Sequence, residues 1–95
     1  MTYKVDTYFA DGIQVGVVKE ENPSFEWLQQ EIGGYIEIPP RLKGAKRKVL
    51  CYCDEDGLMK GLPPNLAATN RAIALDYNIT HALVGTVVFV EKDPG

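Results

Sequence analysis

Two segments of the chain carry residue types that could do chemistry, and the first is a basic loop at residues 41–48. It holds half of the ten basic residues: Arg41, Lys43, Lys46, Arg47 and Lys48. An arginine guanidinium binds phosphate or carboxylate as a planar fork, and a lysine ammonium binds it as a point charge. The loop therefore predicts a site for a small anionic ligand, with a solvated loop as the alternative.

The second segment, Asp54 to Asn70, combines an acidic cluster, two glycines, a Pro-Pro pair and a helix start. Asp54, Glu55 and Asp56 could hold a hard cation, but their spacing is not that of a calcium loop. Acidic residues beside glycine are typical of a solvated turn. We therefore expect no metal site, and interpret the three carboxylates as contacts to a partner or as a solvated turn.

Three further side chains are candidates for ligand binding. Asn65 and Thr69 are one helical turn apart and share a face, although Asn65 is first of all a helix N-cap. The ring of Tyr35 could stack on a base or simply pack in the sheet.

No catalytic constellation is recognisable. His81 is the single histidine, and Cys51 and Cys53 lack the second pair of ligands that a zinc signature needs. The glycine-rich phosphate motifs are also missing. We therefore expect reduced structural thiols, no catalytic residue, no cofactor and no enzymatic activity.

Length and charge narrow the function classes. Ninety-five residues predict one domain, 1–95, and a domain this small often gains stability by association, so we expect a homo-oligomer. A net charge of −3 argues against binding duplex nucleic acid. Without a signal segment or a long apolar run, we expect a cytoplasmic protein, in the cytosol of a host cell, that does not bind membranes.

The N-terminal third must supply a hairpin and a helix. Alternating residues 3–9 and 13–20 flank Asp11-Gly12, which predicts a β-hairpin. Ser24 then caps a helix over 25–32 that packs through Phe25, Leu28 and Ile32. Trp27 lies off that face and is a candidate partner contact.

Five further elements are expected. Strands are predicted at 35–38, at 49–55 and from residue 83 onward, a helix at 66–75, and a brief return strand at 58–61. The last run is the most β-branched, which indicates a central strand, with Gly85 marking a bulge or a close approach. The fold class is α+β, a mainly antiparallel sheet of about five strands with two short helices packed on one face. The expected order is strand, strand, helix, strand, strand, helix, strand.

Three strings in this order and spacing carry a family resemblance: GGYIEI (33–38), DEDGLMKGLPPNLAAT (54–69) and VGTVVFV (84–90). They resemble an uncharacterised family of small domains found mainly in bacteriophages and mobile elements. The resemblance covers about two thirds of the chain, from Phe25 onward. It implies a small phage-type accessory protein and supplies no catalytic residues.

Two hypotheses follow. In the first, a non-enzymatic counter-defence protein sequesters a small anionic ligand, such as a nucleotide immune signal, through the basic loop, Tyr35 and the 54–70 segment. In the second, the protein is an inhibitor or adaptor of a host defence or nucleic-acid-processing protein. Its working surface would be Trp27, the acidic turn and an exposed strand edge.

Overall fold

The computed structural model describes residues 1–46 and 48–93, which form a five-stranded antiparallel sheet with two helices. In chain order the elements are β1 (Thr2–Tyr8), β2 (Gln14–Lys19), α1 (Phe25–Ile32), β3 (Ile36–Glu37), β4 (Leu50–Asp54), α2 (Leu66–Ala74) and β5 (Val87–Asp93). The predicted α+β class and element order are confirmed. No helix in the described ranges is long and apolar enough to cross a membrane.

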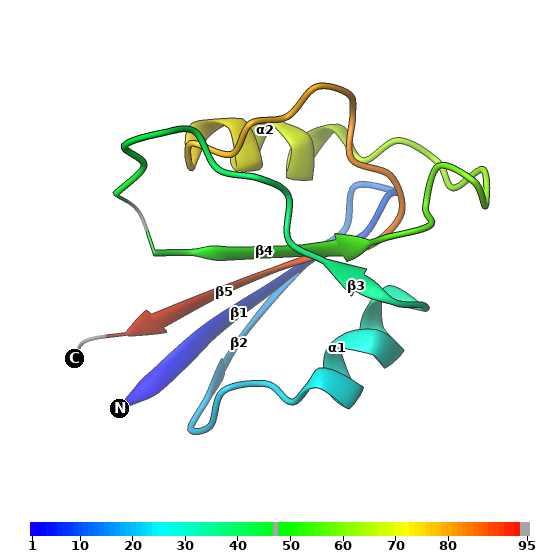
Figure 1. The fold of residues 1–95 in the computed structure, drawn as a ribbon. Helices are drawn as coiled ribbons and strands as arrows, with labels where there is room; N and C mark the ends of the chain where they lie inside the picture. Colours follow the sequence, from blue (N-terminus) through cyan, green and yellow to red (C-terminus); the bar gives the residue numbers. More distant parts are fainter. Residues whose placement is uncertain (47, 94–95) are drawn as a thin grey trace.

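The strands lie side by side in the order β2–β1–β5–β4–β3 (Figure 1), so β2 and β3 are the two edges. β1 and β2 form the predicted hairpin. Its turn is closed by the Asp11 carboxylate, which accepts a hydrogen bond from the Ile13 N–H at 3.0 Å, and by Gly12, whose φ is 95°. The positive φ explains why glycine follows the aspartate.

β5 is the central strand, as its β-branched run predicts. Its residues 87–90 are at most 4% exposed, because odd-numbered side chains pack on one face of the sheet and even-numbered ones on the other. Gly85, just before β5, has a φ of 72°, and a Cβ there would lie 2.7 Å from the Leu62 side chain. A close approach therefore explains this glycine.

The two helices cover opposite faces of the sheet (Figure 1). Leu28 and Ile32 of α1 pack in one cluster with the even-numbered valines of β5. Ala68 and Ala72 of α2 pack in a second cluster with Phe89. The expectation that both helices share one face is wrong. The physical reason is that β5 is apolar at consecutive positions, so both faces need cover.

α1 begins and ends where the sequence predicts. The Ser24 hydroxyl accepts a hydrogen bond from the Trp27 N–H at 3.1 Å, and Gly33 ends the helix in the left-handed conformation. Its packing face differs from the expectation, because Phe25 is 57% exposed while Trp27 packs against the α1-side cluster. Phe25, in the first turn of α1, therefore lies outside the core.

β4 confirms the predicted alternation around the cysteines. Cys51 and Cys53 face α2, Tyr52 faces the α1 side, and both thiols are buried and free. The return strand expected at 58–61 does not form, because this stretch belongs to a continuous turn. β3 is shorter than predicted and consists of two residues.

Candidate functional site

The strongest candidate surface is the turn of residues 54–61, between β4 and α2. It is built on Asp54, which is only 5% exposed. Its carboxylate accepts hydrogen bonds from the Lys60 ammonium at 2.7 Å and from the Asp56 N–H at 2.8 Å. The Lys60 N–H also donates to the Asp56 carbonyl at 3.0 Å. Since a buried carboxylate is costly unless paired and hydrogen-bonded, this network stabilises one conformation of the turn.

Large apolar side chains stand in solvent at and beside this turn. Met59 is 90% exposed and Leu58 is 60% exposed at its tip. Tyr35 is 67% exposed, and its carbonyl accepts a hydrogen bond from the Glu55 N–H at 2.9 Å. The start of β3 is therefore tied to the turn, which presents apolar groups beside a carboxylate.

An open hollow of about 420 Å³ lies against the same turn. It is lined by Gln29, Gly34, Tyr35, Asp56 and Lys60. The structure thus brings Tyr35, predicted to bind a ligand, next to Asp56, predicted to contact a partner.

The three predicted acidic contacts have different environments. Glu55 is exposed and Asp56 is half-buried, so both carboxylates belong to the surface. Asp54 is buried and bonded within the turn. It therefore holds the turn in position, whereas the sequence predicts that it contacts a partner. Within the described ranges, no group of three or more His, Cys, Asp or Glu residues could hold a metal ion.

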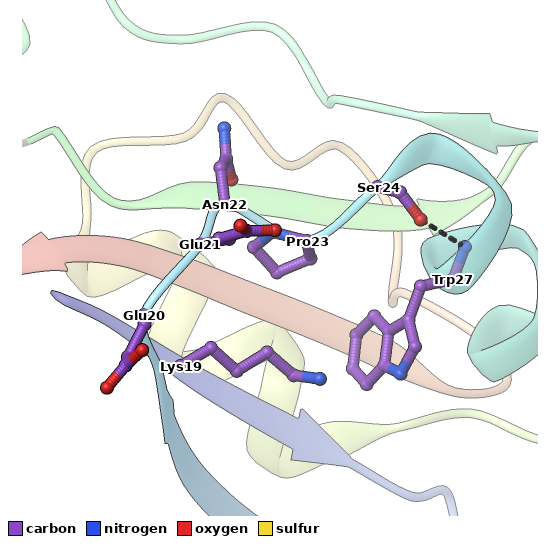
Figure 2. A pocket seen from close by; sticks show the side chains of 7 residues that line it. All are labelled: Lys19, Glu20, Glu21, Asn22, Pro23, Ser24 and Trp27. Carbon is purple, nitrogen blue, oxygen red and sulfur yellow. Dashed lines mark hydrogen bonds between the residues drawn. The ribbon is translucent and has the colours of Figure 1, made fainter.

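Trp27, the fourth predicted partner contact, is half-buried beside a second hollow of about 510 Å³. Figure 2 shows the Lys19 side chain reaching toward the indole, with its ammonium 4.3 Å from the ring centroid. Glu20 and Glu21 also line this hollow, on the segment that joins β2 to α1. Trp27 therefore stacks with a lysine and packs on the core.

Arg41 of the basic loop is half-buried and hydrogen-bonded to other parts of the chain. Its guanidinium donates to the Val49 carbonyl at 2.6 Å and to the Tyr77 hydroxyl at 3.1 Å, and lies 4.8 Å from the Tyr77 ring centroid. Tyr77 in turn donates to the same carbonyl at 2.7 Å. These bonds anchor the loop on Tyr77, which follows α2. The Arg41 guanidinium is therefore used in holding the fold together.

The lysines of the basic loop are exposed to solvent, unlike Arg41. Lys43, Lys46 and Lys48 are exposed, whereas Arg47 lies outside the described residues. Lys48 lines an open hollow of about 380 Å³ together with Met1, Glu91 and Lys92.

The basic loop and β3 lie at opposite ends of β4 (Figure 1). The loop leads into Leu50 at the start of that strand, whereas Tyr35 precedes Ile36, which pairs with Asp54 at its end. Strands rise by about 3.3 Å per residue, so the two ends of β4 are roughly 13 Å apart. The described ligand-binding candidates are therefore not gathered in one pocket.

Asn65 and Thr69 are also structural. The Asn65 amide accepts from the Ala68 N–H and donates at 2.8 Å to the carbonyls of Tyr8 and Gly85. The Thr69 hydroxyl donates to the Asn65 carbonyl. Both side chains are buried, so the predicted N-cap is confirmed and neither polar group faces a ligand site.

The thiols have little nucleophilic character. Burial, helped by the negative charges of Glu37 and Asp54, raises the pKa of Cys53 to about 12. Burial also raises the pKa of Cys51 far above its usual range. Cys53 and His81 line one hollow of about 180 Å³, but a thiol that stays protonated at neutral pH is a poor nucleophile.

Sequence reasoning missed the apolar tip of the turn. The sequence predicts a return strand that includes Leu58 and Met59, where one of the two side chains would point into the sheet. The signal that could have found them is their position between two glycines, Gly57 and Gly61. Glycines on both sides of so short a segment favour a turn over a strand.

Fold and site together define a small α+β domain with a rigid, apolar-tipped turn beside an edge of its sheet. The chain belongs to the family described as a domain of unknown function (DUF3846), whose family model matches residues 8–95. This match confirms the resemblance to an uncharacterised domain family. Among curated proteins and solved structures, nothing matches the chain significantly.

Proposed function

We propose that the protein is a non-enzymatic protein-binding module, an inhibitor or adaptor that docks through the 54–61 turn. The observation that carries this proposal is Met59, 90% exposed at the tip of a turn whose base is fixed by the ion pair between the buried Asp54 and Lys60. Contiguous exposed apolar groups rimmed by polar ones mark interaction sites. A surface already held in one conformation loses less entropy on binding.

The side chains also indicate the chemistry of the partner. Met59 and Leu58 favour an apolar pocket, and methionine adapts its shape to such a pocket. Glu55 and Asp56 at the rim, on a chain of net charge −3, favour basic groups around that pocket. The expected partner is a protein with an apolar depression bordered by lysine or arginine.

Capture with matched variants tests this proposal. Immobilised wild-type protein is expected to retain a discrete protein from a lysate of the cell that carries the gene, and Leu58→Glu with Met59→Glu is expected to lose it. The control is Leu66→Glu with Ile73→Glu, which changes two exposed apolar side chains of α2. Equal capture by all three proteins, or loss with the control pair alone, would contradict the proposal. A changed oligomeric mass of the turn variant would assign the turn to self-association instead.

A second candidate function is sequestration of a small anionic ligand at the basic loop. It is supported by the exposed Lys43 and Lys46 and by the hollow that Lys48 shares with Lys92. Calorimetric titration with cyclic and linear nucleotides is the test. Binding should weaken in Lys48→Ala with Lys92→Ala and persist in Lys4→Ala, an exposed lysine of β1. No heat with any nucleotide would remove this function.

The resemblance to phage and mobile-element domains suggests the setting, which is counter-defence in the cytosol of a host cell. The partner would then be a host defence or nucleic-acid-processing protein. Expression of the wild-type gene should restore plaque formation by a phage on a defended host, and the Leu58→Glu, Met59→Glu variant should not. Protection by neither protein, or equally by both, would count against this setting.

A further inference from the structure

β2 is an edge strand whose charged residue, Lys19, lies at its end, so residues 14–18 lack the usual protection of an edge. Residues 14–18 are all exposed, and among them Val15, Val17 and Val18 are 46%, 42% and 66% exposed. Edge strands are commonly blunted by a charged residue, a proline, a bulge or short length. No charge or proline lies within 14–18, and the pairing of β2 with β1 runs without interruption over the whole strand. The other edge, β3, is two residues long.

The hairpin fixes which backbone groups of β2 point outward. The Phe9 N–H donates to the Ile13 carbonyl at 2.8 Å, so these opposed residues form a hydrogen-bonded pair. Hydrogen-bonded and non-hydrogen-bonded pairs alternate along an antiparallel ladder. The N–H and C=O groups of Gln14, Gly16 and Val18 therefore point away from β1, toward open solvent.

These three outward residues are complementary to themselves. When two copies of β2 are laid antiparallel about a two-fold axis at Gly16, Gly16 faces Gly16 of the second copy and Gln14 faces Val18. Each outward-pointing residue of one copy then has a hydrogen-bonding partner in β2 of the other copy. On the α1 face the same register places Val15 opposite Val17, in the pairs whose side chains approach most closely.

Gly16 suits the centre of such a contact. A Cβ at this position would lie 2.8 Å from the Asp6 carboxylate, which is held by the Arg71 guanidinium at 2.8 Å. The position therefore has no room for a side chain on the α2 face while that ion pair is in place. Without one, two copies can approach closely at the axis.

We propose that two copies of the chain join along β2, antiparallel and centred on Gly16, into one continuous sheet. This contact is separate from the 54–61 turn, which lies by the other edge of the sheet. The pairing buries the exposed valines and satisfies the outward backbone groups. It leaves the turn of each copy free, so the assembly presents two turns to partners.

Sedimentation equilibrium of the full chain tests the dimer. The wild type is expected to approach twice the chain mass of 10.5 kDa as concentration rises. Val18→Pro removes an outward N–H that β1 does not use, and proline is tolerated on a solvent-facing strand edge. This variant should sediment as a monomer, and the matched Val18→Thr, which keeps the N–H, should still dimerise.

A second variant guards against a folding defect. Val15→Lys with Val17→Lys leaves the backbone intact and places like charges opposite one another across the axis. It should also be monomeric, with a circular dichroism spectrum like that of the wild type. A wild type that stays monomeric at every concentration, or a dimer that survives both the proline and the lysine variants, would overturn the proposal.

Cross-linking tests the register. A mixture of Val15→Cys and Val17→Cys proteins should form a disulfide-linked dimer on mild oxidation, because these positions face each other across the axis. Each protein alone should cross-link poorly. The native thiols, Cys51 and Cys53, are buried and should not interfere. Efficient cross-linking of Val15→Cys alone or of Val17→Cys alone would place the axis elsewhere and contradict the pairing about Gly16.

Discussion

Asp54 and Lys60 show how a single ion pair shapes the proposed binding surface. Lys60→Met removes the cation that faces a buried carboxylate, which should lower the free energy of unfolding by about 1–2 kcal/mol. The same change at the exposed Lys43 should alter it by less than about 0.5 kcal/mol. Urea unfolding measures both. Equal effects of the two substitutions would mean that the pair does not stabilise the turn.

Cys53 gives a prediction in pH. Its pKa in the folded chain is about 12, mainly because the thiol is buried, against an ordinary value of 9.0. Between these values the unfolded chain has released the proton and the folded chain keeps it, so the free energy of unfolding should fall as pH rises from about 9 to about 12. Urea unfolding across this range should show a shallower fall for Cys53→Ala. An identical pH dependence would show that burial of this thiol does not contribute.

At the scale of elements, Asn65 connects α2 to β1 and to the segment that precedes β5. Asn65→Ala removes the N-cap and leaves the carbonyls of Tyr8 and Gly85 without this donor, so a loss of about 2–4 kcal/mol is expected. Asn65→Ser restores a cap acceptor but not the two donated bonds, and should recover only about 1 kcal/mol. Full recovery in thermal or urea unfolding would reduce the role of Asn65 to capping.

The elements follow closely from local sequence. Turns and helix caps are specified by single residues, through a side-chain acceptor or a positive φ, so the boundaries of elements near them are predictable. These residues are Asp11, Gly12, Ser24, Gly33 and Asn65. The placement of the helices is not local in this way. It depends on β5 becoming the central strand with two apolar faces, which is a consequence of the whole pairing order.

The candidate site was harder to predict than the fold. The sequence shows polar and charged residues but not their distant partners. The ion pair of Asp54 and the hydrogen bonds that Arg41 and the Asn65 amide donate could therefore not be predicted from it. Their polar groups bond to other parts of the chain. The exposed pair Leu58 and Met59 was overlooked because apolar residues are expected in the core, and only the turn geometry shows them in solvent.

At the scale of the whole molecule, the two proposed surfaces are spatially separate. The β2 edge and the 54–61 turn belong to different edges of the sheet and share no residue. Variants that abolish dimerisation should therefore leave partner capture per chain within about twofold, since distant sites act additively. The affinity of the monomeric Val18→Pro variant for the captured protein, compared with that of the wild type, checks this. Complete loss of capture in that variant would show that the partner needs both copies.

Photo-crosslinking from the tip of the turn tests the central claim most directly. A photoreactive amino acid in place of Met59 is compared with the same group in place of Ile73, an exposed position on α2. The proposed function predicts a discrete protein adduct from position 59 alone, competed by unlabelled wild type and not by Leu58→Glu with Met59→Glu. Adducts of equal yield from both positions, or none from position 59, would contradict a protein-binding role for this turn.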